Sequence, residues 1–242
     1  MTSTEYPNVT VTTSPEDLRS KLKQYILDTV KPILEFNGLI SIGVSGGSMP
    51  TVLCDVFRSL EKFDWHRIRI FMVDERVVPI NHEDSNCRLY LEKLPQQLHQ
   101  YVIPLALCDT LPRTAQQYET ALRQHIMPEL IGGLPRFDIL FLGMGPDGHT
   151  CSLFPDHHLL KVDSKPWVLY IDDSPKPPPE RVTLSLHCLN AAKNVAFIIS
   201  GEEKADLTKS VLDRDPSYPA SLVQPLNKHL RFFLDKGAAK KL

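Results

Sequence analysis

The sequence predicts an α/β protein with a doubly wound, mostly parallel sheet and helices on both faces. Short runs of about six apolar residues, typical of strands buried on both faces, alternate with segments of helical periodicity. Glycine and polar residues follow three of the predicted strands. Ligands of such sheets bind beyond the carboxyl ends of the strands, so this edge is where a site is expected.

Composition favours one soluble domain over residues 1–242, without a linker or internal repeat. Apolar residues make up 42% and charged residues 23% of the chain, so the core needs no disulfide or metal. The net charge of −2 argues against a general nucleic-acid binder. The five cysteines form no CxxC pair and are expected to be free thiols. With no secretory signal and no apolar run of about 20 residues, a cytoplasmic protein without membrane contact is expected.

The first third of the chain predicts a helix, a strand, a second helix and a second strand. Ser14-Pro15-Glu16-Asp17 combines a serine cap, a first-turn proline and two acids that complement the helix dipole. Strands are predicted at 39–44 and 68–73 from their apolar runs. The two helices are indicated by apolar residues at helical spacing, which are Leu18, Leu22, Ile26, Val30 and Ile33 in the first and Met49, Val52, Leu53, Val56, Phe57 and Leu60 in the second.

The rest of the chain continues this alternation. A helix capped by Asp84 or Ser85 runs through Leu94, and the apolar spacing over 115–130 predicts a longer one. The proline-rich run 175–179 is interpreted as a stiff surface loop. The remaining predicted elements are strands at 137–142, 167–171, 182–186, 195–199 and 230–234 and a helix at 202–212.

Ser45-Gly46-Gly47-Ser48 follows the first predicted strand and precedes a helix with Pro50 in its first turn. Glycines let the backbone approach a ligand, and the exposed N–H groups of a helix start attract an anion. The segment is therefore either a phosphate-binding loop or a tight turn in which Ser48 caps the helix. It is not a Walker loop, because G-x-x-x-x-G-K-[ST] is absent.

Asp74-Glu75-Arg76 follows the second predicted strand directly. A carboxylate and a guanidinium at this place suit the orientation of a sugar hydroxyl and a charged oxygen. The alternative is a surface ion pair at the end of a strand.

Residues 143–150 (GMGPDGHT) contain the spacing G-x-G-x-x-G after a strand. A dinucleotide site also needs a helix that opens there and an acid about 20 residues further on. Pro146, Asp147 and His149 occupy the loop instead, and Asp147 would repel a pyrophosphate. A glycine-rich loop that presents His149 as a general base fits better, with a structural histidine as the alternative.

Metal and serine-hydrolase chemistry have weak support. His157-His158 with Asp156 is the candidate metal cluster, but adjacent side chains do not readily face one ion, and no HExxH or Cys/His cluster supports it. We therefore expect no metal. Ser45 and Ser152 lack the G-x-S-x-G elbow of a serine hydrolase.

Taken together and in this order, the motifs resemble the 6-phosphogluconolactonase family over about residues 14–234. Cys151 departs from the family's usual alanine, and both side chains are small. The matching segments are Ser45 to Pro50 (SGGSMP), Asp74 to Arg76 (DER), Ser85-Asn86, Gly143 to Pro155 (GMGPDGHTCSLFP), Pro177 to Leu184 (PPPERVTL) and Gly201 to Ala205 (GEEKA).

The resemblance implies a Rossmann-like fold of the sugar-phosphate isomerase type and no cofactor. It implies hydrolysis of 6-phospho-D-glucono-1,5-lactone to 6-phospho-D-gluconate, the second step of the oxidative pentose phosphate pathway. The related amino-sugar phosphate isomerase/deaminases carry a glutamate just after the glycine-histidine block and usually an aromatic residue at the place of Arg76. Here the first place reads Ser152-Leu153-Phe154-Pro155, so both differences favour the lactonase.

The expected site follows from the resemblance and the local chemistry. His149 is the expected general base. Arg76 is expected to stabilise the negative charge that develops during the reaction or to orient the substrate. Asp74 is expected to bind a sugar hydroxyl or to position Arg76. The expected substrate-binding residues are Ser45, Gly46, Gly47 and Ser48 for the phosphate, aided by Lys204 and Arg181, together with Gly145, Asp147 and Gly148. A phosphosugar lactone is the expected ligand, and a monomer or weak dimer the expected state. A non-catalytic sugar-phosphate-binding protein is a further alternative, against which the intact Asp147-Gly148-His149 argues.

Overall fold

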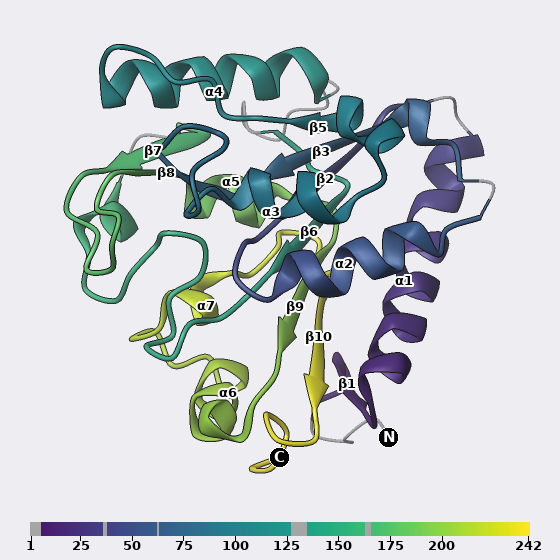
Figure 1. The fold of residues 1–242 in the computed structure, drawn as a ribbon. Coiled ribbons are helices and arrows are strands. Elements are labelled where there is room, and N and C mark those ends of the chain that lie inside the picture. Colours follow the sequence, from purple (N-terminus) through teal and green to yellow (C-terminus); the bar gives the residue numbers. More distant parts are fainter. Residues whose placement is uncertain (1–5, 36–37, 62, 127–134, 163–165) are drawn as a thin grey trace.

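A seven-stranded sheet forms the centre of the molecule, and every neighbouring pair in it is parallel (Figure 1). The computed structural model describes residues 6–35, 38–61, 63–126, 135–162 and 166–242. The predicted doubly wound α/β fold is confirmed. The strand order across the sheet is β1 (Val9–Thr12), β10 (Leu230–Asp235), β9 (Val195–Ile199), β6 (Ile139–Leu142), β2 (Ile40–Val44), β3 (Ile68–Met72) and β5 (Val102–Ile103).

The direction of winding reverses between β2 and β6. From β2 the chain proceeds to β3 and β5 on one side, then returns to β6 and continues to β9 and β10 on the other. Val44 of β2 pairs with Met72 of β3 and with Phe141 of β6, so these strands end at the same edge. This is the switch point at which such sheets bind ligands.

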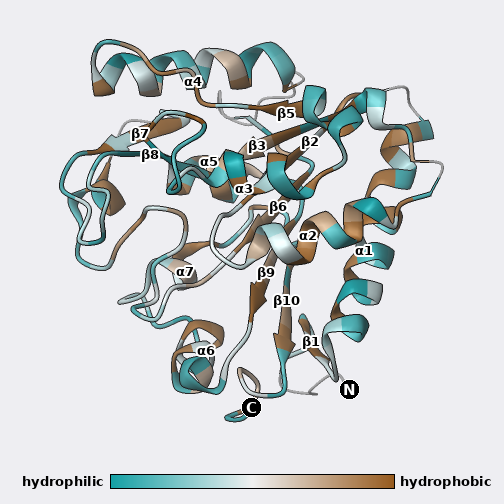
Figure 2. Ribbon diagram, in the orientation of Figure 1, coloured by the Kyte–Doolittle hydropathy of each residue, from teal (hydrophilic) through white to brown (hydrophobic). Residues whose placement is uncertain are grey.

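Helices cover both faces of the sheet, and each face has its own apolar core. In β3, Ile70 and Met72 belong to one core, whereas Phe71 between them belongs to the other, as the alternation of side chains along a strand requires. Figure 2 shows the hydrophobic strands between helices of mixed character. The first face carries α1 (Pro15–Glu35), α2 (Met49–Arg58) and α3 (Asn86–Lys93), and the second carries α4 (Leu111–His125), α5 (Leu186–Ala191), α6 (Ala205–Leu212) and α7 (Pro219–Leu222).

A second, antiparallel sheet of three strands was not predicted. It consists of β4 (Asp74–Arg76), β8 (Arg181–Leu184) and β7 (Val168–Ile171) in that order. Two of the predicted strands thus belong to this sheet, and Asp74-Glu75-Arg76 is itself a strand rather than only the end of one. The Leu184 amide donates to the Val73 carbonyl (2.8 Å), which joins this sheet to the chain leaving β3.

Most predicted elements are found within a few residues of their expected bounds. Leu130, placed in the long helix that became α4, lies outside the described residues. The predicted helix 202–212 begins with a 3₁₀ turn, η4 (Glu202–Lys204), before α6; the other 3₁₀ turns are η1 (Trp65–Arg67), η2 (Gln96–Tyr101) and η3 (His158–Lys161). The strands β1 and β5 were missed, because β1 (VTVT) alternates valine with threonine instead of forming an apolar run and β5 is only 2 residues long.

The structure contains no helix, in the part of the chain that it describes, with the length and hydropathy needed to cross a membrane.

Candidate active site

A cavity of about 250 Å³ opens at the carboxyl edge of the sheet, at the switch point between β2 and β6. Polar residues from the ends of β2, β3, β6 and β9 meet in it, although they are far apart in the sequence. The residues that form its wall are Ser45, Gly46, Gly47, Ser48, Met49, Val52, Asp74, Arg76, Asn86, Gly143, Met144, Gly145, His149, Cys151, Arg181, Ile198, Ser200 and Lys204.

The Ser45 to Ser48 loop is fixed by two hydrogen bonds to the carboxyl end of the neighbouring strand β6. The Ser45 amide donates to the Phe141 carbonyl (3.1 Å), and the Ser45 hydroxyl accepts from the Gly143 amide (3.3 Å). Gly46 passes so close to Asn86 that a Cβ there would overlap its side chain, and Gly47 has φ +65°, a left-handed conformation that favours glycine. The loop therefore brings bare backbone to the cavity wall.

Ser48 occupies the N-cap position of α2, but its side chain makes no capping hydrogen bond. Ser48 is exposed and belongs to the cavity wall. Ser48 therefore has the predicted N-cap position, but the prediction that its side chain caps the helix is wrong. The uncapped N–H groups of α2 suit an anion in the cavity.

Asp74 lies at the start of β4, where it is only 6% exposed. The Ser152 hydroxyl donates to its carboxylate (2.8 Å), and the Asn86 side-chain amide donates to its carbonyl (2.9 Å). Asn86 is thus a site residue that was not predicted, although Ser85-Asn86 is one of the segments that carry the family resemblance. Two buried polar atoms in this part of the wall, Arg76 Nε and Asn86 Oδ1, have no hydrogen-bond partner among the described residues.

Glu75, between Asp74 and Arg76, has a structural role. Its buried carboxylate accepts hydrogen bonds from the amides of Arg76 (2.7 Å), Asn86 (2.8 Å) and Cys87 (2.7 Å). Burial raises the pKa of Glu75, and the three N–H donors oppose that rise only in part. The carboxylate fixes β4 to the first turn of α3, which sets the positions of the residues on either side of it.

Arg76 and Arg181 are register partners on β4 and β8, and both belong to the cavity wall. Arg76 donates through Nη1 to the Asp84 carbonyl (2.8 Å). Arg181 is 3% exposed, and its pKa is lowered by burial and by the charge of Arg76. Arg181 was expected to bind the phosphate together with Lys204, whereas the structure places it beside Arg76.

His149 enters the cavity wall from the glycine-rich loop after β6. Its Nδ1 is hydrogen-bonded to the Asp147 carboxylate, and its ring packs on Phe154 with 4.8 Å between centroids. A Cβ on Gly145 would overlap the imidazole, so glycine is needed there. Burial lowers the pKa of His149; Asp147 opposes this effect, and the charge of Lys176 adds to it. The imidazole is therefore neutral at neutral pH, with Nε2 as the basic nitrogen when Nδ1 donates to Asp147.

Lys176 is a second residue that the sequence argument missed. Its Nζ lies 3.1 Å from His149 Nδ1 and donates to Asp147 (3.2 Å). Its loop, interpreted from the sequence as a surface loop, is held against the site by Arg181, which donates to the carbonyls of Lys176 (2.8 Å), Pro177 (3.1 Å) and Pro178 (3.0 Å). A lysine in a proline-rich run carries no sequence signal for such a contact.

Most of the predicted site residues meet in this cavity. Lys204, at the end of η4, lies in the wall with the Ser45 to Ser48 loop. Asp147 and Gly148 are outside the wall in the described structure: Asp147 contacts His149 from outside it, and Gly148, with φ +80°, packs so closely on Tyr218 that a Cβ would overlap that ring. Their predicted role in substrate binding has no contact to support it.

The fold and the site define a class of protein: a doubly wound α/β protein with a cationic, ligand-sized cavity that contains a neutral histidine. Residues 13–232 match the model of the family described as glucosamine-6-phosphate isomerases/6-phosphogluconolactonase. The chain belongs to this family.

Individual relatives agree with this assignment. A protein from Caenorhabditis elegans is 47% identical over 236 residues, which cover 96% of this chain and 88% of the relative. The 6-phosphogluconolactonase of Rattus norvegicus is 40% identical over 246 residues, covering 97% and 93%. The crystal structure of 6-phosphogluconolactonase from Thermotoga maritima superposes with a TM-score of 0.78 at 28% identity, covering 94% of this chain and 99% of that one.

Proposed function

We propose that this protein hydrolyses 6-phospho-D-glucono-1,5-lactone to 6-phospho-D-gluconate, the second step of the oxidative pentose phosphate pathway. The relatives named above support the substrate and the reaction. The observation that carries the chemistry is the presence of neutral His149 and three cationic side chains, Arg76, Arg181 and Lys204, in one cavity. Lactone opening needs an activated water, stabilisation of an oxyanion and a proton for the ring oxygen.

His149 acts as the general base in this proposal. Nε2 takes a proton from water as the water oxygen attacks the lactone carbonyl carbon, and it returns that proton to the ring oxygen as the C–O bond breaks. Asp147 holds Nδ1, so it fixes the tautomer and orients the ring. Asp147 is thus a positioning residue for His149, in place of the substrate contact first expected.

Arg76 stabilises the oxyanion that forms on the carbonyl oxygen. Two of its features support this role: its Nε is buried without a partner in the described structure, and it lies opposite a second arginine. A preorganised cation in a site with little water is worth far more than one in bulk solvent. Asp74, fixed by Ser152, is suited to accept a hydrogen bond from a sugar hydroxyl.

The phosphate binds at the other end of the cavity, between the Ser45 to Ser48 loop and Lys204. Lys204 follows β9, whereas Arg76 follows β3, and these strands are three steps apart across the sheet, or about 14 Å at the usual spacing of strands. An extended phosphosugar fits between two such cationic ends, with His149 between them. Arg181 is assigned to the lactone end, because it lies beside Arg76 and supports the loop of Lys176.

An amino-sugar phosphate isomerase/deaminase remains the second candidate within the family. A glucosamine-6-phosphate deaminase structure shares the fold with a TM-score of 0.74 at 19% identity. By the resemblance described above, those enzymes have a glutamate just after the glycine-histidine block. Here that segment contains Ser152, whose hydroxyl donates to Asp74. No specific observation in the cavity favours deamination.

The deciding experiment offers both substrates to the same purified protein. We expect 6-phosphogluconolactone to be consumed faster than its uncatalysed hydrolysis and glucosamine-6-phosphate to release no ammonia. Ammonia release without lactone hydrolysis would select the deaminase, and binding of 6-phosphogluconate without either reaction would select a non-catalytic binding protein. We further propose a cytoplasmic monomer or weak dimer that uses no cofactor and binds neither nucleic acid nor membranes.

A further inference from the structure

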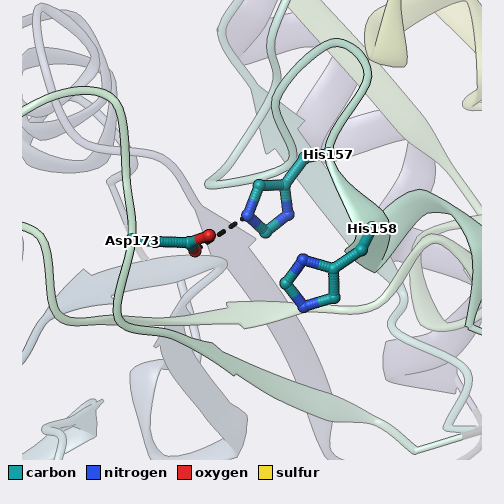
Figure 3. A group of neighbouring side chains, drawn as sticks. All are labelled: His157, His158 and Asp173. Carbon is teal, nitrogen blue, oxygen red and sulfur yellow. Dashed lines mark hydrogen bonds and ion pairs between the residues drawn. The ribbon is translucent and has the colours of Figure 1, made fainter.

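Outside the cavity, His157, His158 and Asp173 bring three potential metal ligands together (Figure 3). One ligand atom from each lies within 4.8 Å of the other two, and His157 Nε2 is 2.9 Å from Asp173 Oδ1. None of the three belongs to the cavity wall.

The backbone explains how two adjacent histidines face the same point, against the sequence argument. His157 is the extended N-cap of η3, with φ −74° and ψ 141°, whereas His158 is the first residue of that 3₁₀ turn. This change of conformation turns the two rings to the same side, with centroids 4.3 Å apart. The acid that joins them is Asp173, not the neighbouring Asp156 that the sequence suggested.

We propose that His157, His158 and Asp173 bind one Zn²⁺, with water as the fourth ligand. Zinc takes His nitrogen and carboxylate oxygen at about 2.0–2.2 Å in a tetrahedron, so its ligand atoms lie about 3.3–3.5 Å apart. His157 Nε2 and Asp173 Oδ1 are closer than this, at 2.9 Å, and the other ligand atoms lie within 4.8 Å of one another, so small side-chain movements reach the tetrahedral spacing. His158 and Asp173 are exposed, so their side chains are able to move to the ion without displacing the core.

Zinc binding also sets the tautomer of His157. The proton between Nε2 and Asp173 is displaced and taken up by Nδ1. The weak hydrogen bond from the Leu159 amide to Nδ1 (3.3 Å) is then exchanged for solvent. This exchange and the exposure of two ligands limit the affinity, so the site is weaker than a closed structural zinc site with four protein ligands.

The ion would join two segments that both reach the candidate active site. His157 follows the loop that carries His149, and Asp173 begins the loop that carries Lys176. Zinc therefore cross-links these segments from outside the cavity. It stabilises the folded protein by binding to it alone and takes no part in the proton transfer.

The test uses the untagged, chelator-stripped full chain titrated with ZnCl₂ in a calorimeter. We expect one ion per chain, and at least about tenfold weaker binding for both His158→Ala and Asp173→Asn. His229→Ala, which removes an exposed histidine far along the chain, and Cys108→Ser, which removes an exposed thiol, should bind zinc like the unaltered protein.

Thermal unfolding gives a second readout. Zinc should raise the Tm of the unaltered chain and of His229→Ala, but not that of His158→Ala. Wild-type zinc affinity in both ligand variants would overturn the proposal, as would loss of binding in Cys108→Ser. Absence of binding by the unaltered chain would overturn it as well. None of these results bears on lactone hydrolysis, which is measured separately.

Discussion

Arg76 and Arg181 lie directly opposite each other on β4 and β8, so two guanidinium side chains share one face of a short antiparallel pair. Like charges at such positions destabilise a sheet. Burial adds to that cost for Arg181, whose pKa it lowers. The oxyanion site proposed above would account for the pair, because an anion placed between the two side chains relieves their repulsion.

Replacing His149 tests the general base. His149→Ala should lower kcat by about 10²–10⁴-fold with a smaller change in KM, since the side chain acts on water rather than on the phosphate. Steady-state kinetics with 6-phosphogluconolactone measure both constants, with His229→Ala as the matched control. A kcat within threefold of the unaltered protein would exclude His149 as the base.

Replacing Arg76 separates stabilisation of the transition state from binding of the substrate. Arg76→Ala should reduce kcat by about 10²–10³-fold, the usual cost of losing one oxyanion donor. Arg113→Ala, which removes an exposed arginine paired with Asp109, should change neither constant. If only KM rises, Arg76 holds the substrate and does not act on the oxyanion.

The phosphate group should account for much of the preference for 6-phosphogluconolactone over plain gluconolactone. Hydrogen bonds to a charged group contribute about 1.5–3 kcal/mol each, so two or three of them predict a preference of about 10³-fold or more in kcat/KM over plain gluconolactone. Lys204→Ala should narrow that ratio and leave the slow reaction of plain gluconolactone nearly unchanged, whereas Lys236→Ala should leave the ratio intact. Equal efficiency on the two lactones would show that the Ser45 to Ser48 loop is only a turn.

The pH profile should report the contact between Lys176 and His149. His149 works as a base only when neutral, so kcat/KM falls as pH drops through its pKa, which burial and Lys176 hold below the usual 6.5. Lys176→Ala removes one of the two effects that lower this pKa, so the acid limb should move to higher pH. Lys176→Arg keeps the charge and should keep the limb in place. An unmoved limb in Lys176→Ala would show that the contact does not tune the base.

Chelation should leave hydrolysis intact. The proposed mechanism uses no metal ion, and the proposed zinc ligands His157, His158 and Asp173 lie outside the cavity wall. The initial rate should therefore be the same before and after dialysis against EDTA, within the error of the assay. Loss of activity that zinc restores would contradict this mechanism.

The strands β2, β3, β6, β9 and β10 of the main sheet were predictable because each is a largely apolar run, and the longer helices carry clear periodic patterns. Ser14 confirms the local rules in detail, since its hydroxyl accepts from the Asp17 amide (3.2 Å) at the start of α1. The second sheet was not predictable. Its strand β4 contains Asp74, Glu75 and Arg76, whose polarity gives no strand signal, and it exists through pairing with β8 about a hundred residues later.

In the candidate site, too, the residues with local sequence signals were predicted and those that depend on long-range contacts were not. Ser45 to Ser48 and His149 were predicted because each lies in a glycine-rich loop directly after a strand. The need for glycine in the loop and the chemistry of the side chains can both be read from a few neighbouring residues. Lys176 and Asn86 were missed, since their roles depend on contacts with Asp147 and Asp74 that only the folded chain brings about. Gly148 was assigned to substrate, but its left-handed φ and its packing on Tyr218 account for the glycine.

The pairing of β1 with β10 has a consequence for the order of folding. The Thr12 hydroxyl donates to the Leu234 carbonyl across 222 residues of sequence. During synthesis β1 therefore emerges long before its partner strand exists, and one edge of the sheet stays open until β10 is complete. Strands β2, β3 and β6 find their neighbours earlier, so the half of the molecule that forms the Ser45 loop is expected to assemble first on the ribosome. A nascent chain stalled before residue 230 would then bury the β2–β3 pair while β1 remains accessible to protease.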